Sequence, residues 1–282
     1  MIRKILCGGN ITGIMSQIHQ SAVVHKDAQL AEDVTIGPNC VIASGVTIGA
    51  GTLLEENVVI KENVELGKNN HLFANCVIGG WPQSVHLRSV TEIGRIVIGN
   101  RNIIHEQVTI HPGSHPDSVT KVGNDNFFMV GSHLGHDCIV EDKIVMSNYV
   151  QISGHCKIET GAWFSGLAAS HQFVTISKWC YVAGLAGINR DIPPFLTVSG
   201  HYPPRVRGVN KRGMQRAGMS EQQQEIIFEA YKKLYCQGGT LLENAKVLAQ
   251  KEGLDENVRA MVDAITKSSE QQYGRYLEKF RH

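Results

Sequence analysis

The chain has 282 residues, with 27 lysines and arginines against 26 aspartates and glutamates, and a net charge of +1 at pH 7. This balance provides no overall field that would draw the protein to nucleic acid or to an anionic membrane. Because the sequence lacks a run of 18 or more apolar residues, we expect no integral membrane segment.

The first fourteen residues do not share the pattern that follows. Arg3 and Lys4 are followed by an apolar stretch, Ile5 to Cys7, that is too short for a secretory signal. We interpret residues 1–14 as an N-terminal extension.

From Ile18 to Ile78 an apolar residue stands at every sixth position, and the same phase recurs with interruptions up to Ile188, skipping Ser170. This period fits neither an α-helix, whose apolar face recurs every 3.6 residues, nor a strand, which alternates every 2. It is typical of a parallel β-helix, in which three hexapeptides close one triangular coil and the sixth residue points inward. We therefore predict a mainly β fold with a parallel β-helix over residues 15–194.

Two segments interrupt the period, and both are predicted to be loops extruded from the coils. The first covers residues 80–97 and begins with Trp81 and Pro82, and the second covers residues 114–121. Loops that leave a rigid scaffold commonly hold binding residues.

The pattern changes after Pro194. Residues 195–219 are rich in glycine, proline and arginine, and we interpret them as a connector. Capping boxes at Ser220–Gln223 and Thr240–Glu243, and a helix start at Asp255, predict a small C-terminal α-helical domain over residues 220–282.

Seven cysteines, an odd number, lack the paired spacing of a metal site. Five of them follow an inward position by four residues, where a small apolar side chain is needed: Cys40, Cys76, Cys138, Cys156 and Cys180. We expect reduced, structural thiols and a cytoplasmic protein.

Histidines are numerous and cluster in the second half of the repeat, at His111, His133, His136, His155 and His171. With 18 residues per coil and coils about 4.8 Å apart, His136, His155 and His171 should form a short outward ladder. One neutral imidazole could act as a general base, or three could hold Zn²⁺. The spacing does not decide between these readings.

The faces of such a prism would carry His133, His171 and His201 rather than charge alone. This favours contact between copies of the chain, and we expect a symmetric homotrimer.

The motifs resemble those of a known family. They are Gly131-Ser-His-Leu-Gly-His-Asp-Cys138, Ser153-Gly-His155, Ala169-Ser-His-Gln-Phe173, Asp191-Ile-Pro-Pro194 and Gly208-Val-Asn210. Together they are similar to the UDP-N-acetylglucosamine O-acyltransferases of lipid A biosynthesis, from about Met15 to the end of the chain. The resemblance implies a left-handed β-helix, a trimer with sites between subunits, and transfer of a (R)-3-hydroxyacyl chain from acyl carrier protein without metal or cofactor.

The resemblance also implies roles for particular residues. His136 matches the general base, Asp137 the carboxylate that orients it, and Gly154 an N–H donor to the oxyanion. Gly184 matches a position that limits acyl-chain length. Matches to residues that hold the sugar nucleotide or the acyl-pantetheine arm are Gln83, His133, His155, His171, Gln172, Asn210 and Arg216.

Four positions depart from the family pattern. Ser84 and His86 stand where an Asp and a Lys are common, and Arg212 and Ala217 where a Glu and an Arg are common. A 3-amino UDP-sugar acceptor, acylated to an amide, is therefore an alternative. The acidic donor protein would meet a local basic patch, which comprises Arg205, Arg207, Lys211, Arg212 and Arg216.

Two hypotheses of other classes remain at this point. One is a γ-type carbonic anhydrase with Zn²⁺ on three histidines, which stoichiometric zinc would favour. The other is a non-catalytic scaffold, which failure to bind acyl carrier protein or a UDP-sugar would favour.

Overall fold

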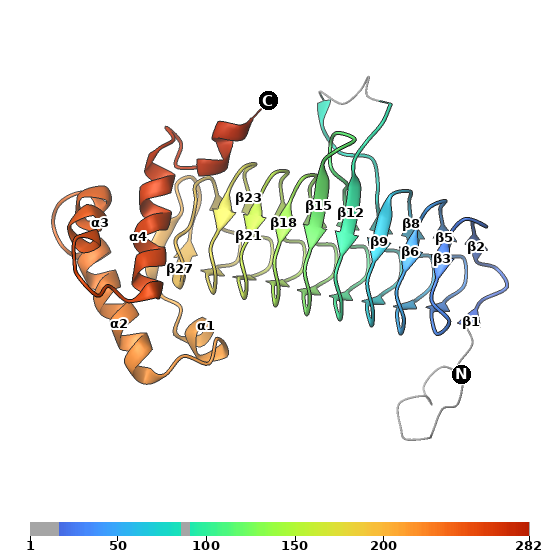
Figure 1. The fold of residues 1–282 in the computed structure, drawn as a ribbon, viewed down its shortest axis with the longest axis horizontal. Coiled ribbons are helices and arrows are strands. Elements are labelled where there is room, and N and C mark those ends of the chain that lie inside the picture. Colours follow the sequence, from blue (N-terminus) through green and yellow to red (C-terminus); the bar gives the residue numbers. More distant parts are fainter. Residues whose placement is uncertain (1–16, 86–90, 282) are drawn as a thin grey trace.

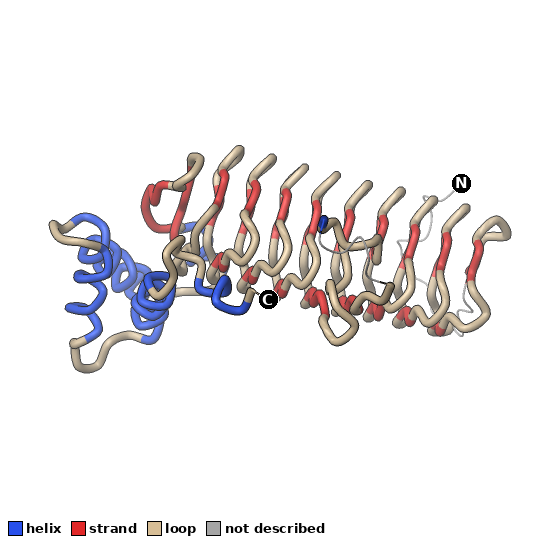
Figure 2. Tube along the Cα trace, turned by 90° about the horizontal axis from the view of Figure 1, so that it is seen from above, coloured by secondary structure: helices blue, strands red, loops and turns tan. Residues whose placement is uncertain are grey.

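The computed structural model describes residues 17–85 and 91–281, so the predicted extension 1–14 and His86 lie outside the described residues. The chain winds into a long three-sided β-helix with a cluster of helices at its C-terminal end (Figure 1). Seen from above, the short strands line up in rows along the prism, and turns form its edges (Figure 2). The predicted mainly β architecture is confirmed.

Three sheets form the faces, and every third strand belongs to the same sheet. Sheet A contains β1 (Gln17–Ile18), β4 (Thr35–Ile36), β7 (Leu53–Leu54), β10 (His71–Leu72), β13 (Ile103–Ile104), β16 (Phe127–Phe128), β19 (Val145–Met146), β22 (Trp163–Phe164), β25 (Tyr181–Val182), β27 (Leu196–Ser199) and β28 (Arg205–Val209). Sheet B contains β2 (Val23–Val24), β5 (Val41–Ile42), β8 (Val59–Ile60), β11 (Val77–Ile78), β14 (Thr109–Ile110), β17 (His133–Leu134), β20 (Gln151–Ile152), β23 (Ala169–Ser170) and β26 (Gly187–Ile188). Sheet C contains β3 (Gln29–Leu30), β6 (Thr47–Ile48), β9 (Val64–Leu66), β12 (Arg95–Ile98), β15 (Val119–Val122), β18 (Ile139–Val140), β21 (Lys157–Ile158) and β24 (Thr175–Ile176).

The sixth-position residues build the core, as the period predicts. Parallel pairing joins Val41 to Val59 and Ile42 to Ile60, so identical positions stack one coil apart. Ile42 and Ile60 are almost completely buried, whereas Ile18, in the first of the described coils, is 46% exposed. Each buried apolar side chain of this size stabilises the fold by roughly 2 kcal/mol. Ser170 occupies an inward slot, where its hydroxyl lies 3.4 Å from the Cys156 Sγ.

Both interruptions of the period leave the prism at the same edge. We call this edge the B–C corner: it consists of the turns between a sheet B strand and the following sheet C strand. One insertion lies between β11 and β12 and the other between β14 and β15, and both project from the side of the prism (Figure 1). The strands β12 and β15 begin at Arg95 and Val119, so each loop is shorter than predicted.

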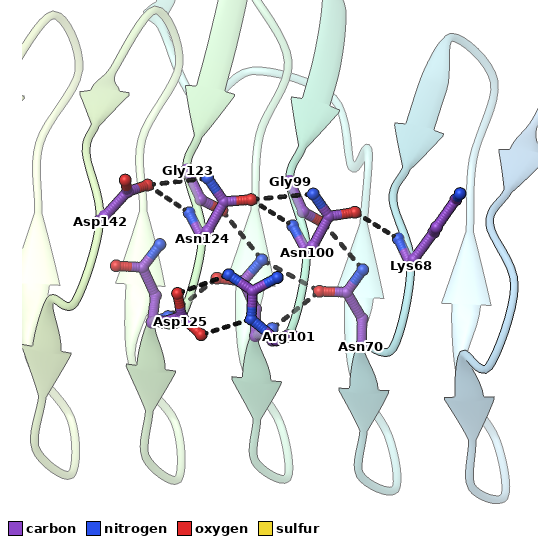
Figure 3. Close-up of polar contacts among 11 residues, drawn as sticks. Lys68, Asn70, Gly99, Asn100, Arg101, Gly123, Asn124, Asp125 and Asp142 are labelled. Carbon is purple, nitrogen blue, oxygen red and sulfur yellow. Dashed lines mark hydrogen bonds and ion pairs between the residues drawn. The ribbon is translucent and has the colours of Figure 1, made fainter.

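A ladder of asparagines at the next edge keeps the coils in register across these insertions (Figure 3). The Asn100 Oδ1 accepts from the N–H of Lys68 at 2.7 Å, although 32 residues separate them. The Asn124 Oδ1 accepts from the Asn100 N–H at 2.8 Å over 24 residues, and the Asp142 Oδ1 accepts from the Asn124 N–H over 18. Because the ladder is continuous, the inserted residues do not shift the coils that follow.

The β-helix ends later than Pro194. Strand β27 pairs in parallel with β25 and in antiparallel with β28, so the predicted connector begins with two strands of sheet A. Leu196 and Val198 are buried two residues apart, and the six-residue period does not predict a strand with this alternation. This corrects the predicted boundary between the β-helix and the connector.

The helices follow at the same end of the prism. They are α1 (Lys211–Arg216), α2 (Glu221–Tyr231), the π-helical turn η2 (Lys232–Cys236), α3 (Leu241–Ala249), α4 (Glu256–Ser269) and the 3-10 helix η3 (Tyr276–Phe280). The capping boxes that begin at Ser220 and Thr240 are both formed, and Asp255 caps α4 as predicted. None of the helices in the described ranges has the length and apolar character needed to cross a membrane.

Candidate active site

Three consecutive turns of the B–C corner carry the predicted catalytic residues. They follow β17, β20 and β23, whose pairing aligns Leu134 with Ile152 and Ile152 with Ser170. This register places His136, Gly154 and Gln172 in one column, and Asp137, His155 and Phe173 in the next. Hydrogen bonds from the His155 N–H to the His136 carbonyl (2.9 Å) and from the Phe173 N–H to the Gly154 carbonyl (3.2 Å) join the turns.

His136 and Asp137 form a close pair. The His136 Nδ1 lies 2.7 Å from the Asp137 Oδ2. An ionised carboxylate only accepts hydrogen bonds, so the Nδ1 carries the proton and the Nε2 presents a lone pair. The Nε2 has no hydrogen-bond partner among the described residues. This is the arrangement of a general base held by an orienting carboxylate.

Asp137 is held ionised by the loop that precedes its coil. Burial by itself would raise the pKa of this carboxyl, but hydrogen bonds from His136, Ser114 and Ser118 outweigh burial and hold the pKa well below its usual range. The Ser114 N–H donates to both carboxylate oxygens at 3.1 and 3.2 Å, and the Asp137 N–H donates to the Thr120 hydroxyl at 2.8 Å. Asp137 therefore remains charged over the whole neutral range.

The prediction that His136 lies outward and accessible is only partly correct. Its ring lies outside the apolar core, but the residue is only 6% exposed. The reason is the 111–118 insertion, which leaves the same corner one coil earlier and whose backbone contacts Asp137. This burial excludes bulk water from the His136 ring, including its Nε2.

His155 lies beside this pair. Its ring stands edge-on to His136 with centroids 4.9 Å apart, and its Nε2 is 3.6 Å from the Asp137 Oδ2. Burial lowers the pKa of His155, while the charge of Asp137 acts in the opposite direction. The neutral imidazole can therefore contact the carboxylate without displacing His136.

His171 does not join the ladder, which corrects the predicted stack of three imidazoles. It lies 16 residues after His155 rather than 18, so the register places it two columns away, above Ser153. Its Nδ1 donates to the Gln172 carbonyl at 3.1 Å instead.

A pocket of about 220 Å³ opens beside the His136 ring. It contains five of the predicted site residues, namely Gln83, His133, His136, Gly154 and Gln172. The remaining lining residues were not predicted as ligands: His111, Gly135, Gln151, Ile152 and Ser153. Register arithmetic could have identified Gln151, because it pairs with His133 one coil away.

Gly154 forms the floor of this pocket because no larger residue fits there. A Cβ at this position would lie 2.7 Å from the Cε1 and Nε2 of His136. The Gly154 N–H makes no hydrogen bond to any part of the chain that the structure describes. It is therefore free to donate to an oxyanion beside the base.

His111 and His133 form the opposite wall, with ring centroids 4.9 Å apart. The His133 Nδ1 is held by the Thr109 hydroxyl at 2.8 Å. Burial, followed by the charges of His133 and His136, lowers the pKa of His111 to about 4. Both imidazoles thus provide neutral hydrogen-bonding groups at neutral pH.

The pKa of His111 predicts a pH-dependent stability. Because the unfolded chain binds this proton near pH 6.5, the contribution of neutral His111 is present above that pH and is lost as the pH falls toward 4. Between pH 7.5 and 5.5, the free energy of unfolding should therefore fall by about 1 kcal/mol less in His111→Gln than in the wild type. Urea unfolding at the two pH values measures this, with the exposed His25→Gln as a control that keeps the wild-type dependence. Identical slopes for all three proteins would contradict the assignment.

Three predicted site residues lie elsewhere on the chain. Gly184 lies exposed at the turn between β25 and β26, an edge of the prism that does not carry His136. Asn210 caps α1, where its side chain accepts from the Gly213 N–H and donates to the Trp179 carbonyl. Arg216 lies over the Trp163 ring at 4.4 Å, on sheet A. A single chain does not bring these residues to the pocket.

The donor set at the corner differs from the three-histidine zinc site that the sequence left open as an alternative. Among the described residues, the group with ligand atoms close enough to hold an ion is His136, Asp137 and His155, all within 4.8 Å. His171 is not part of it, so the geometry of a three-imidazole site is absent from the described chain.

The comparisons with known proteins agree with this geometry. Residues 15–50 match the family of bacterial transferase hexapeptides, and residues 191–273 match domain 2 of the UDP N-acetylglucosamine O-acyltransferase family. The acyl-[acyl-carrier-protein]--UDP-N-acetylglucosamine O-acyltransferase of Gloeothece citriformis is 40% identical over 61% of this chain and 61% of its own length. That of an Anaeromyxobacter strain is 37% identical over 69% of this chain and 75% of its own length.

A solved structure extends the likeness to nearly the whole chain. The UDP-N-acetylglucosamine acyltransferase of Francisella novicida superimposes with a TM-score of 0.83 at 35% identity, covering 89% of this chain and 91% of that protein. The predicted left-handed β-helix with a small C-terminal helical domain is confirmed by this likeness. The chain belongs to the UDP-N-acetylglucosamine O-acyltransferase family.

Proposed function

We propose that the protein transfers a (R)-3-hydroxyacyl chain from acyl carrier protein to the 3-hydroxyl of UDP-N-acetylglucosamine, the first step of lipid A biosynthesis. The observation that carries this proposal is the buried His136–Asp137 pair, whose unpartnered Nε2 faces a pocket beside Gly154. The names of the two relatives include the same donor protein and the same sugar nucleotide.

The proposed reaction assigns each group one task. The His136 Nε2 takes the proton of the sugar hydroxyl as the oxygen attacks the thioester carbonyl, and Asp137 stabilises the imidazolium that forms. The Gly154 N–H donates to the resulting oxyanion. When the tetrahedral intermediate collapses, the carbon–sulfur bond breaks and the pantetheine thiolate receives the proton from His136. The scheme uses no dissociable cofactor and no metal.

We propose that the active form is a homotrimer, and the chemistry of the three faces supports this. Most outward positions on sheet C are charged or polar, as at Glu65, Lys121 and Lys157, and Ile139 is an exception. Outward positions in the later coils of sheet A are apolar or aromatic, as at Phe127 and Trp163, whereas Gln17, Thr35 and His71 are polar. Sheet B carries a row of valines in its first four coils. Packing face A of one copy on face B of the next would bury both and leave face C in water.

A trimer would also explain where the distant residues act. Gly184, Asn210 and Arg216 lie on parts of the chain that do not border the pocket, so they would serve the site of a neighbouring copy. Gly184 would then limit the acyl chain, and Asn210 and Arg216 would contact the nucleotide.

We propose that the donor protein docks on the basic patch. Arg205, Arg207, Lys211, Arg212 and Arg216 are all exposed, on β28 and α1. A strongly acidic acyl carrier protein would be attracted to this surface, and the attraction would weaken with added salt.

The described cysteines are free thiols, which supports a cytoplasmic site of action.

The sequence is compatible with two acceptors, UDP-N-acetylglucosamine and a 3-amino UDP-sugar. Ser84 and His86 depart from the pattern in the first loop, and Gln83 from the same loop lines the pocket. A 3-amino sugar would be acylated by the same base to an amide.

Mass spectrometry of the product tests the proposal directly. The purified enzyme would receive UDP-N-acetylglucosamine or its 3-amino analogue, with hydroxyacyl donors of several lengths on acyl carrier protein. We expect an O-acylated UDP-N-acetylglucosamine. An amide formed much faster than the ester would shift the assignment to the amino sugar, and no product from either acceptor would refute acyl transfer. Sedimentation equilibrium of the same sample tests the trimer.

A further inference from the structure

The end of the chain returns from the helical domain to the β-helix. After α4, residues 274–281 run back along the last coils, and Figure 1 shows the terminus beside the prism rather than at the tip of the helices. The match to the family's second domain ends at residue 273, so this segment lies beyond it.

Buried polar contacts anchor the segment on the last coils. The Asp191 carboxylate accepts from the N–H of Thr175 at 2.7 Å and from the N–H of Tyr276 at 2.8 Å, and the Asp191 N–H donates to the Gly274 carbonyl. Arg275 is only 6% exposed and donates to the Asn189 carbonyl at 3.0 Å. Such contacts fix the backbone of the segment against the coils.

Glu278 then connects the anchored part to the penultimate residue. Its carboxylate lies 2.8 Å from the Arg275 guanidinium and 3.1 Å from that of Arg281. The Arg281 guanidinium lies over the ring of Phe173, 4.8 Å from the centroid.

Phe173 in turn stacks on His155. The two rings are parallel to within 3°, with centroids 4.5 Å apart, and Phe173 is 5% exposed. Its backbone φ of +64° is the turn conformation that recurs at the equivalent positions His155 and Trp179. The ring lies between His155 on one side and Arg281 on the other.

His155 completes the path to the reacting groups, since it contacts both the Asp137 carboxylate and the edge of His136. Given the function proposed above, we propose that Phe173 and Arg281 are positioning residues for the acyl transfer. They hold the His155 imidazole neutral and in place, so that Asp137 remains the partner of His136.

The charges around His155 support this role. Burial is the main cause that lowers the pKa of His155; Asp137 acts in the opposite direction, and the charges of His136, His115 and Arg281 add to the lowering. A protonated His155 would compete with His136 for the Asp137 carboxylate and so weaken the base. This would lower kcat, and substrate binding would change little.

Arg281→Gln tests the proposal, because Arg281 is half-exposed and the change should leave the fold intact. We expect kcat to fall about three- to ten-fold with KM for both substrates within two-fold. The acid limb of the kcat profile should move to higher pH, and Arg281→Lys should restore part of the rate. Phe173→Leu should change kcat in the same direction.

Lys279→Gln is the matched control, because it removes a cation from the same segment whose ring contacts are with Tyr276 and Phe280. It should leave kcat unchanged. An equal loss in Lys279→Gln, or a rise in KM for the acyl donor without a fall in kcat, would show a general charge effect on docking and overturn the proposal.

A second measurement separates this proposal from the proposed reaction. Exchange of the imidazole C2 hydrogen, followed by mass spectrometry, reports the pKa of individual histidines without any substrate. The pKa of His155 should rise in Arg281→Gln and not in Lys279→Gln. An unchanged value would overturn the positioning role even if the enzyme is active, and inactive wild-type enzyme with the expected rise would overturn the reaction alone.

Discussion

His136→Ala should lower kcat/KM by at least about 100-fold while the protein remains folded and keeps its oligomeric state. The substitution removes the only imidazole among the described residues whose Nδ1 is held by a buried carboxylate and whose Nε2 is free at the pocket. General bases typically contribute factors of 10² to 10⁴. Steady-state kinetics with acyl carrier protein donors, together with sedimentation, would measure both quantities.

The control for this experiment is His25→Ala. His25 lies on the same corner of the prism in an early coil, and its Nδ1 is 3.5 Å from the Asp27 carboxylate, but its side chain is 44% exposed. Its loss should leave the rate unchanged. If His136→Ala retained most of the activity, His136 would be removed from the mechanism.

Gly154→Ala should lower kcat about 100-fold and lower the free energy of unfolding by roughly 1–3 kcal/mol. The added Cβ would lie 2.7 Å from the His136 imidazole, which the Asp137 hydrogen bond prevents from moving aside freely. A displacement of the base by about 1 Å can cost a factor of 100. Kinetics and thermal unfolding of the purified variant would measure the two effects.

Gly166→Ala provides the comparison. Gly166 lies in the turn between β22 and β23, at another edge of the prism, and an added Cβ would meet only the Asn148 carbonyl at 3.5 Å, an ordinary contact. This variant should retain the wild-type rate. Full activity in Gly154→Ala would show that the close approach to His136 has no role in positioning it.

The architecture was predictable because one rule generates most of it. An apolar residue at every sixth position requires three inward side chains per 18-residue coil, and parallel pairing then follows for strand after strand. The rule no longer holds at the C-terminal end of the β-helix. Leu196 and Val198 extend sheet A at a spacing of two, so the boundary at Pro194 was placed too early.

The site was predictable only in part, because loop lengths and small differences in sequence spacing decide which side chains come into contact. His136 and His155 are 19 residues apart, one more than a coil, and this offset puts His155 beside Asp137. His171 lies outside the cluster because it follows His155 by 16 residues, two fewer than a coil. The contact of Ser114 with Asp137 depends on the path of an insertion that no period describes.

The amino-acid sequence by itself determined the coil, the inward residues and, through its motifs, the family and His136 as the candidate base. Only the tertiary structure decided that His136 is buried, that its Nδ1 rather than its Nε2 is engaged, and that Arg281 reaches the active-site column from the far end of the chain. The physical reason is that repeats specify local geometry through stacking of equivalent positions. Burial, protonation and contacts between residues more than 100 positions apart depend instead on how the irregular segments pack against the stacked coils.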